Sequence, residues 1–415
     1  MPTQQPSPSG NTETSSGYTL ELHDSALKVN AQEWDALLHA QSNPTPFMRH
    51  AYLAALETSG SATAQTGWAP VFFTLRQDGD AANVLIGACV LYVKSHSYGE
   101  YVFDWAWADA YQRHGLQYYP KGVLAVPFTP VPGTRLLAAN ATARAAMLQA
   151  LIDWARDAEL SSVHLLFAEE EDVTAARQAG MMLRHTVQFH WQNRHPVTGE
   201  PYRDFDDFLA SLHQDKRKKI RQERRRVHDA GVRFRAIPGA QMSAADWDFF
   251  YACYERTYLE HGNAPYLSRD FFQHMQSGMP ANWVLFLAER DNHAIACSLV
   301  ALRPAAKPGD TGATEAIAYG RYWGALERVD QLHFEACYYQ PLQWCIANGV
   351  ARFEGGAQGQ HKMARALLPV QATSAHWLAH PAFAEAVERF LEREGQGIDA
   401  YMGELNERSP FRHST

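Results

Sequence analysis

The chain has 415 residues, of which 46% are hydrophobic and 20% charged, and a formal net charge of −8. This length is too great for one typical hydrophobic core, so we expect two domains of about 150–200 residues. No apolar run approaches the roughly 18–20 residues of a membrane-spanning helix. The five cysteines are odd in number and lack CxxC spacing, which argues against a disulfide framework or a zinc site. We therefore expect a cytoplasmic protein with no integral membrane segment and no bound metal.

The first half of the chain predicts a tail followed by alternating strands and helices. Residues 1–17 are rich in Ser, Thr, Pro and Gln and lack the features of a signal peptide, so we expect a disordered tail. A turn at Pro46 leads into an amphipathic helix. Period-two alternation, helical periodicity and turn residues then predict a hairpin (71–93), a helix (143–160), a strand (162–168), a short helix (173–179) and a strand (183–192).

The second half repeats this order of elements. After a turn and a helix from Pro265, the same patterns predict a hairpin (284–302), a helix (332–348), a strand (350–356), a short helix (361–368) and a strand (372–378). A strand–helix–strand unit favours a parallel pair with a right-handed crossover. The repeat predicts two tandem α/β domains with mixed sheets, from an internal duplication. We place them at 18–200 and 201–415, the second with a basic linker helix and a C-terminal helical extension.

The join between the two halves is strongly basic. Residues 204–231 suggest one long helix with Asp204 as its N-cap and Gly231 as its stop signal. Arg217–Arg226 carries seven Lys or Arg residues and one acid. Three interpretations of Lys216–Arg226 remain open: a solvated helix face, a surface that follows the phosphates of a tRNA, or a patch that touches anionic lipid.

Two aromatic segments of the first half also leave alternatives open. In residues 118–133, Lys121 is flanked by aromatic residues and prolines, which suits either the rim of a substrate cleft or a proline-shaped edge strand. Residues 103–111 (FDWAWADAY) suit a ligand site or, as we favour, the core.

The predicted helix 332–348 carries several reactive side chains. Pro341 removes one backbone donor, so we expect a kink near Cys337–Pro341. His333 and Cys337 are four residues apart, which permits a thiol–imidazole pair, although we favour a packed helix face. His333 and Glu335 are two residues apart, so they cannot share a face and only one of them is expected to point into a site.

Taken together, several segments carry a resemblance to a known family. They are NPTPFMRHAYLAALETSGS, YYPKGVLAVPFTPVPGTRLL, QFHWQN, KRKKIRQERRRV, YGRYWG, LHFEACYYQ and GAQGQHKMAR, spread over about residues 43–378. The element order resembles the GCN5-related N-acetyltransferase fold, and the tandem arrangement resembles the FemAB-type peptidyltransferases of peptidoglycan synthesis. The chain is most similar to a bacterial family of predicted N-acyltransferases related to FemAB.

The resemblance implies an N-acyltransferase with no tightly bound cofactor. Acyl-CoA or aminoacyl-tRNA would be the co-substrate, and a small-molecule amine or a cell-wall precursor would be the acceptor. Acetyltransferases usually carry a phosphate-binding loop, Arg/Gln-x-x-Gly-x-Gly/Ala, after the fourth strand. Here Arg321 and Gly324 match it, but Leu326 replaces the last small residue, which slightly disfavours coenzyme A. The first half has no such loop, so we expect it to be structural or to contribute a cleft wall.

The segment Glu354–Lys362 is the strongest local candidate for donor binding. Gly355, Gly356 and Gly359 open a turn between a strand and a helix expected to start near His361. Free N–H groups at a helix N-terminus bind anions. Lys362 and Arg365 add positive charge, so we expect this turn to hold a phosphate or carboxylate.

Amide formation needs a base for the amine and donors for the oxyanion. The base candidates are Glu354, which alternates with Phe353 on its strand, and His361, with His333 and Glu335 as further catalytic candidates. The expected substrate-binding residues are Tyr319, Tyr322, Trp323 and Gln358.

Two other classes of function compete with this enzyme. The first is a non-catalytic protein that binds RNA or a precursor on an acetyltransferase-like scaffold, and the second is a scaffold without a small-molecule site. Convergence of Glu354, His361, Arg321 and Lys362 in one concave pocket would favour the enzyme. Scattered positions would favour the binding protein.

Overall fold

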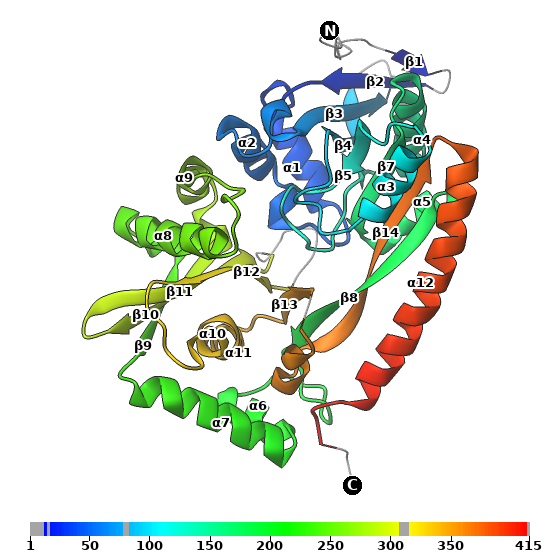
Figure 1. The fold of residues 1–415 in the computed structure, drawn as a ribbon. Coiled ribbons are helices and arrows are strands. Elements are labelled where there is room, and N and C mark those ends of the chain that lie inside the picture. Colours follow the sequence, from blue (N-terminus) through cyan, green and yellow to red (C-terminus); the bar gives the residue numbers. More distant parts are fainter. Residues whose placement is uncertain (1–11, 15–16, 78–82, 307–314, 358, 413–415) are drawn as a thin grey trace. The chain divides into compact units, whose positions relative to one another are not determined.

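The computed structural model describes residues 12–14, 17–77, 83–306, 315–357 and 359–412 (Figure 1). The chain forms two compact units. Among the described residues, unit 1 comprises those up to Thr186 and Ala372–Asp399, and unit 2 comprises residues 187–306, 315–371 and 400–412. These units differ from the predicted ranges 18–200 and 201–415, because Val187 to Glu200 belong to unit 2 and Ala372–Asp399 belongs to unit 1.

Unit 1 is built on a mixed sheet. Its strands are β1 (Thr12–Thr14), β2 (Tyr18–His23), β3 (Trp68–Gln77), β4 (Val84–Lys94), β5 (Lys121–Leu124), β6 (Leu137–Ala138), β7 (Ser162–Ala168) and part of β14 (Leu368–Leu378). Neighbouring strands pair antiparallel, except that β5 and β7 are parallel. The first strand includes Thr12–Thr14, so the predicted tail is wrong for these residues; the rest of 1–16 lies outside the described residues.

Helices cover this sheet with apolar faces. They are α1 (Ala31–His39), α2 (His50–Thr58), α3 (Trp105–Arg113), α4 (Ala141–Asp157) and α5 (Glu170–Gln178). Along α4, Met147, Leu148 and Leu151 recur at helical spacing and are fully buried in one cluster with Phe73 and Leu91 of the sheet. Each such side chain stabilises the fold by about 1.5–3 kcal/mol. The helix and strands predicted here are confirmed.

Unit 2 contains its own series of strands with mixed pairing. Its strands are β9 (Arg233–Pro238), β10 (Trp283–Arg290), β11 (His293–Arg303), β12 (Ile317–Ala325), β13 (Arg352–Ala357) and part of β8 (Met182–Gln192). All of these pairs are antiparallel except β12 with β13. Helices α8 (Ala244–Glu260) and α9 (Arg269–Gly278), each capped by a serine, belong to this unit.

The two units share a strand pattern. In unit 1, β3, β4, β5 and β7 form two antiparallel pairs and then a parallel pair, and β10, β11, β12 and β13 do the same in unit 2. The last strand of each series is then flanked by a strand from the other half of the sequence: β14 pairs with β7, and β8 pairs with β13. This exchange explains why the units do not follow the halves of the sequence.

The basic linker consists of two helices instead of the single one predicted. Helix α6 (Phe205–Ser211) begins at Asp204, whose side chain accepts a hydrogen bond from Asp207 N, so the predicted N-cap is confirmed. The chain is extended at Leu212, and α7 (Gln214–Asp229) follows. Leu212 forms a β-bridge with Phe411, and His213 N donates to Pro410 O at 2.9 Å. The C-terminal segment therefore takes the hydrogen bonds that a continuous helix would have used.

The last element is a long helix, α12 (Pro381–Glu407), which is the predicted C-terminal extension. Within the described residues, no helix has the length and apolar character needed to cross a membrane.

Candidate functional site

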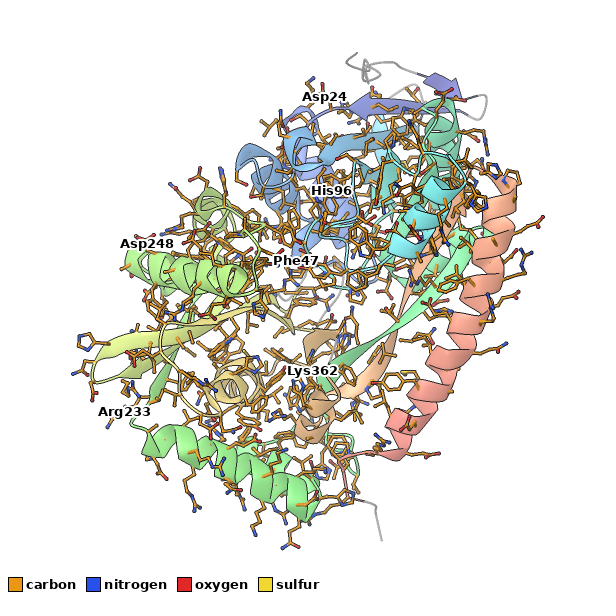
Figure 2. The ribbon with its side chains drawn as sticks, viewed as in Figure 1. Asp24, Phe47, His96, Arg233, Asp248 and Lys362 are labelled. Atoms are coloured by element: carbon orange, nitrogen blue, oxygen red, sulfur yellow. The ribbon has the colours of Figure 1, made fainter. Side chains whose placement is uncertain are left out.

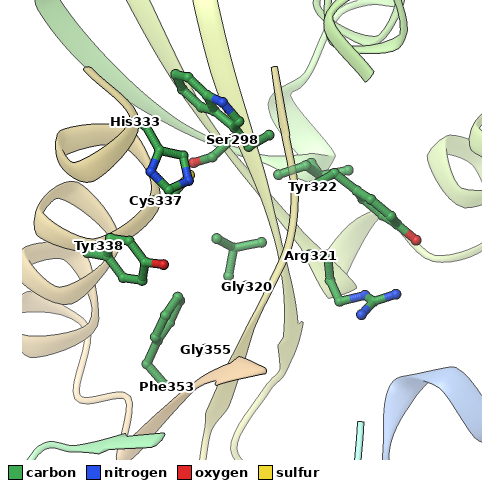
Figure 3. A pocket seen from close by; sticks show the side chains of 12 residues that line it. Ser298, Gly320, Arg321, Tyr322, His333, Cys337, Tyr338, Phe353 and Gly355 are labelled. Atoms are coloured by element: carbon green, nitrogen blue, oxygen red, sulfur yellow. The ribbon is translucent and has the colours of Figure 1, made fainter. Parts of the chain in front are cut away.

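A pocket opens in unit 2 where the parallel strands β12 and β13 separate. Their ladder runs from Ile317 paired with Arg352 to Tyr319 paired with Glu354 and then ends. Beyond it lies a cavity of about 160 Å³ (Figure 3). Its lining comes from β11, β12, β13 and the helix after β12: Ser298, Leu299, Val300, Gly320, Arg321, Tyr322, Trp323, His333, Cys337, Tyr338, Phe353 and Gly355.

A β-bulge shapes the strand side of this pocket. Val300 pairs with Gly320 and Leu299 pairs with Tyr322, so Arg321 is the extra residue on β12. Gly320 is needed here because a Cβ atom would lie 2.9 Å from Cζ of Phe353. The bulge bends β12 away from β13 and leaves space between them. Figure 3 shows the Arg321 and Tyr322 side chains extending away from the helix that closes the opposite side of the cavity.

The helix side of the pocket contains a π-helical turn. The predicted helix 332–348 is divided into α10 (Leu332–Phe334), the π-helix η6 (Glu335–Tyr339) and α11 (Gln340–Ala347). This irregularity confirms the predicted distortion before Pro341, which has no N–H to donate one turn back. Ser298 Oγ donates to the carbonyl oxygen of Ala336 at 2.5 Å. Because π-turns are rare and recur at functional sites, this one supports the pocket as a candidate site.

Two side chains of this helix present acid–base groups to the pocket. The rings of His333 and Tyr338 lie 5.8 Å apart, and Figure 3 shows the Tyr338 hydroxyl pointing into the cavity. Burial raises the pKa of Tyr338 well above its ordinary value, so it keeps its proton. The pKa of His333 is lowered to about 4, by desolvation of its ring and by the positive charge of His361, Arg365 and Lys362. His333 is therefore neutral near pH 7, and its side chain is accessible to solvent.

His361 lies next to the hydroxyl group of Tyr338. Its Nε2 lies 3.4 Å from the Tyr338 hydroxyl, and its pKa is lowered by desolvation and by the nearby cations Arg365 and Lys362. A neutral imidazole accepts a hydrogen bond from the phenol and orients it. The predicted candidates His333 and His361 thus converge on Tyr338. Glu335 points elsewhere, as its two-residue offset from His333 predicts.

Cys337 lines the same pocket but has the character of a buried thiol. Burial raises the pKa of Cys337 far above its ordinary value, so little thiolate is present near neutral pH. No hydrogen bond between Cys337 and His333 occurs among the described side chains. The favoured interpretation of a packed helix face therefore fits better than a thiol–imidazole pair.

In the predicted anion-binding turn, the ammonium group of Lys362 is bonded to main-chain carbonyl oxygens of the turn itself. Lys362 is buried, and its Nζ donates to the carbonyl oxygens of Gly355 (2.6 Å), Gly356 (3.3 Å) and Ala357 (2.8 Å), near the end of β13 (Figure 2). Burial lowers the pKa of Lys362 to about 8. The helix that follows is the six-residue 3-10 helix η7 (Gln360–Arg365). A short helix and an internally bonded ammonium do not resemble the expected N-terminal phosphate site.

Arg365 also points inward. Its guanidinium pairs with Glu223 of α7 at 2.8 Å, donates to His361 O at 2.8 Å and lies 3.6 Å from the ring centre of Phe334. The Tyr339 hydroxyl donates to the same Glu223 carboxylate. Arg365, predicted to bind the donor, therefore ties α7 to the helices that form the pocket.

Glu354 lies on the opposite face of β13 from Phe353. It is buried, pairs with Arg352 at 2.8 Å and lies 3.8 Å from Nε2 of His190. Phe353 lines the pocket and Glu354 does not. The structure therefore does not bring Glu354 together with His333, His361 and Tyr338. Of the four residues whose convergence would favour the enzyme, only Arg321 lines the pocket, so this criterion taken alone favours the binding protein.

The remaining predicted residues have mixed positions. Tyr319 is buried in the paired part of β12, whereas Tyr322 lines the pocket and packs on Tyr254 and Phe272. Trp323 lines the pocket and lies 5.4 Å from His333, ring centre to ring centre. Gly356 and Gly359 have positive φ angles of 71° and 97° and do not line the pocket, and Gln358 lies outside the described residues.

Gly324 has a packing role that differs from the predicted one. It lies inside β12 and not in a loop, and a Cβ atom there would lie 2.1 Å from Cys253 O of α8. The glycine lets the helix approach the strand. The predicted phosphate loop from Arg321 to Leu326 is therefore wrong in its location, since most of it is strand.

Helix α7 borders a second concavity of unit 2, of about 670 Å³. Lys218, Arg221, Arg225 and His228 follow one face of the helix, and the last three line this concavity with Arg224 and Arg233. Arg233 at the start of β9 is labelled in Figure 2. Glu335 lies at its inner wall, bound to Arg224 at 3.1 Å and to Gln340 at 2.6 Å, and burial raises its pKa. We call this concavity the arginine groove.

The sequence of the whole chain matches one protein family. The model of the FemAB-like family, described as peptidoglycan biosynthesis/recognition, matches residues 25–413. The chain belongs to the FemAB-like family. No functionally curated protein matches it.

Solved structures give more distant similarities. The C-terminal domain of a lysylphosphatidylglycerol synthetase from Agrobacterium fabrum is 10% identical, with a TM-score of 0.46, over 86% of this chain and 94% of that one. The L-PGS structure from Bacillus licheniformis is 11% identical, with a TM-score of 0.45, over 84% and 98%. A tandem GNAT protein from the clavulanic acid biosynthesis pathway is 11% identical, with a TM-score of 0.43, over 87% and 99%. Values this low say nothing about substrates.

The corresponding place in unit 1 of this FemAB-like protein is filled. The parallel ladder of β5 and β7 ends at Leu124 and Leu165, and the fully buried Arg135 occupies the space beyond. Its guanidinium donates to the carbonyl oxygens of Leu166 (3.2 Å), Gly133 (3.1 Å) and Val131 (2.5 Å). A buried side chain therefore lies close to the end of this ladder. The expectation that the first half is structural or contributes a cleft wall stays a prediction.

Several residues of the FemAB-like site were not singled out from sequence. Tyr338 and Ser298 lie in segments without a recognisable catalytic motif, and Phe353 reads as core. The signal that points to Tyr338 is its position three residues before Pro341 in an otherwise helical segment. No group of three or more His, Cys, Asp or Glu side chains suited to a metal ion occurs among the residues that the structure describes.

Proposed function

We propose that this FemAB-like protein transfers an acyl or aminoacyl group from an activated donor to an amine acceptor in peptidoglycan metabolism. The observation that carries the proposal is the pocket at the parting of β12 and β13, where the Tyr338 hydroxyl, the neutral His333 and main-chain groups of separated strands meet. Its volume of about 160 Å³ suits a short acyl or aminoacyl group. The family description supports the peptidoglycan context.

The space between β12 and β13 would hold the reacting carbonyl group of the donor. Among the described residues, the ladder of β12 with β13 ends at Tyr319 and Glu354, and the proposal uses main-chain N–H groups of β12 beyond this point as donors. Such preorganised donors stabilise the negative charge of a tetrahedral intermediate and typically contribute about 3–4 kcal/mol each. A carbonyl between Gly320 and Gly355, which both line the pocket, would meet them.

The side chains on the helix side of the pocket would transfer the protons of the reaction. The acceptor amine attacks the carbonyl carbon, and the neutral His333 takes the proton that the new amide nitrogen releases. The tetrahedral intermediate collapses by breaking the bond to the leaving oxygen or sulfur. A leaving oxygen takes the proton of Tyr338, and the proton held by His333 then returns to the phenolate; a leaving thiolate takes the proton of His333 instead. His361, 3.4 Å from Tyr338, orients the phenol. General acid–base catalysis of this kind contributes about 10²–10⁴-fold.

Acyl-CoA and aminoacyl-tRNA both fit this chemistry as donors, and the arginine groove favours the tRNA. The arginine groove lies on the opposite side of η6 from the pocket, since Glu335 faces the groove while His333, Cys337 and Tyr338 face the pocket. Clustered arginines bind phosphates without regard to sequence. The Lys216–Arg226 segment therefore supports an aminoacyl-tRNA donor over acyl-CoA. A cell-wall precursor or a small amine remains the acceptor of the proposal.

Transfer assays with purified protein test this function. We expect labelled acyl or aminoacyl groups to pass from an acyl-CoA panel or from total charged tRNA to peptidoglycan precursors, and Tyr338→Phe to lower turnover at least about tenfold while the donor still raises the melting temperature. Tyr251→Phe, a half-buried tyrosine of α8, is the matched control and should retain full turnover. Equal turnover of Tyr338→Phe and wild type would overturn the assignment. Donor binding without any transfer would favour the non-catalytic RNA- or precursor-binding alternative.

A further inference from the structure

The loop between β4 and α3 of unit 1 has an inverted distribution of polar and apolar side chains. Along it, Glu100, Val102 and Asp104 are buried, whereas the aromatic residues next to them are exposed. The exposed fractions are 59% for Tyr98, 38% for Tyr101, 58% for Phe103 and 42% for Trp105. A folded loop normally places rings inside and carboxylates in water, so this arrangement calls for a function.

Buried ion pairs hold the carboxylates inside. Lys121, at the start of β5, has no exposed surface, and its Nζ lies 2.8 Å from Glu100 Oε2 and also donates to Asp104. Ser97 Oγ accepts a third hydrogen bond from the same ammonium at 2.8 Å. Lys121 therefore forms neither a cleft rim nor an edge strand, as the sequence suggested, but the anchor of this loop in the middle of a sheet.

Further contacts fix the loop backbone. Lys94 is fully buried 3.5 Å above the Trp68 ring centre, and its Nζ donates to Tyr98 O at 3.2 Å. Arg184 donates to Phe103 O at 2.8 Å. Because the main chain is held at both positions, the rings cannot turn inward without breaking buried ion pairs. The outward rings are therefore preorganised, and ordering them on binding costs little entropy.

The outward face of this loop carries no formal charge. Both acids of residues 95–105 are turned inward, and the exposed side chains are Ser95 and the four aromatic residues, with His96 partly exposed. Tyr98 lies edge-on to Trp105, with 5.1 Å between their ring centres. Tyrosine and tryptophan rings, apolar with a polar tip, favour the headgroup level of a bilayer.

A carbohydrate ligand fits this face less well. Sugar hydroxyls need several fixed polar partners beside an aromatic ring, and small-molecule sites supply such groups at defined positions. Here Glu100 and Asp104 are committed to Lys121, and the main-chain oxygens of Tyr98 and Phe103 are already bonded. An uncharged, fluid apolar phase needs no such partners.

We propose that the aromatic loop Tyr98–Trp105 is a peripheral membrane contact, which seats its rings at the interface of a lipid bilayer. The contact depends on apolar burial and not on lipid charge. It is separate from the transfer chemistry of unit 2, so either proposal can fail without the other.

Flotation of the full chain with pure phosphatidylcholine vesicles tests the contact. We expect the wild-type protein to float with the vesicles, and to do so equally at about 0.5 M salt, where charge attraction is screened within a few ångström. Phe103→Ser with Trp105→Ser should lower the bound fraction at least about tenfold, because two inserted rings are lost. A second double variant, Tyr101→Ser with Phe103→Ser, keeps Trp105, the first residue of α3. It should also lower the bound fraction.

The control removes exposed apolar side chains of unit 2. Leu259→Ser with Val197→Ser changes residues that are 61% and 62% exposed and should float like the wild type. All variants should keep the wild-type melting temperature within a few degrees, since substitutions of exposed side chains change stability little. Failure of the wild type to float, loss of flotation in salt, or unchanged flotation of both loop variants would overturn the proposal. Retention on insoluble peptidoglycan without flotation would overturn it in favour of a carbohydrate.

Discussion

Replacement of Arg365 by alanine should destabilise unit 2 strongly. The side chain is 2% exposed and pairs with Glu223 of α7 at 2.8 Å. It also donates to His361 O and lies 3.6 Å from the ring centre of Phe334. Arg365→Ala would leave the buried Glu223 carboxylate with Tyr339 as its main partner. A buried carboxylate without its cation is the costly part of this change.

The magnitude follows from burial and not from the pair itself. Breaking a buried ion pair from one side typically costs about 3–5 kcal/mol, because the partner charge is stranded. For a unit of this size, each kcal/mol lowers the melting temperature by about 2–4 °C. We therefore expect a decrease of about 6–20 °C. Arg256→Ala, which breaks the exposed pair with Glu260, should cost about 0.5 kcal/mol or less.

A double-mutant cycle measures this coupling. Calorimetric unfolding of Arg365→Ala, Glu223→Ala and the double variant should show that the double variant loses much less than the sum of the single losses, since neither charge is then stranded. A loss below about 1 kcal/mol for Arg365→Ala, or strictly additive losses, would refute the view that this pair fastens α7 to the pocket helices.

Four further outcomes follow from the same structure. Gly320→Ala should block donor binding and cost about 1–3 kcal/mol of stability, because its Cβ would lie 2.9 Å from Phe353 Cζ; a donor titration followed by melting temperature checks both. The pKa of Lys362 is about 8 in the folded chain and 10.5 ordinarily, so the unfolded chain binds more protons between pH 8 and 10.5. The free energy of unfolding should therefore rise with pH over this range, by up to about 3 kcal/mol. Urea unfolding at several pH values should show a flatter rise for Lys362→Met. Glu354→Gln should lower the melting temperature but keep the turnover per folded molecule, and a loss of turnover like that of Tyr338→Phe would restore Glu354 as a base candidate. Arg135→Ala strands three carbonyl oxygens in unit 1 and should cost at least about 3 kcal/mol in urea unfolding, without a change in donor affinity.

Local periodicity was enough to predict most strands and helices, because each element buries one face. The hairpins, α4 and β7 follow the predicted residues closely. The exchange of β8 and β14 could not be predicted, since a strand carries the same alternation whichever sheet it joins. The break at Leu212 was missed for a similar reason: its partner is Phe411, some 200 residues away.

The candidate site was predicted only in part, because sequence does not say which way a side chain turns. Lys362 and Arg365 have the charge of anion-binding residues, yet both turn inward to carbonyl oxygens and to Glu223. Gly324 has the spacing of a loop glycine, yet it serves helix packing. His333 and His361 converge through Tyr338, which has no motif of its own. Its position near a helix-distorting proline was the one usable signal.

The measurement that tests the central claim most directly is a crystal structure of the protein with a non-hydrolysable donor analogue. The account predicts that the acyl carbonyl lies between β12 and β13 beyond Tyr319, with the leaving atom within hydrogen-bond reach of the Tyr338 hydroxyl. An analogue bound elsewhere, with the gap between Gly320 and Gly355 unoccupied, would contradict it.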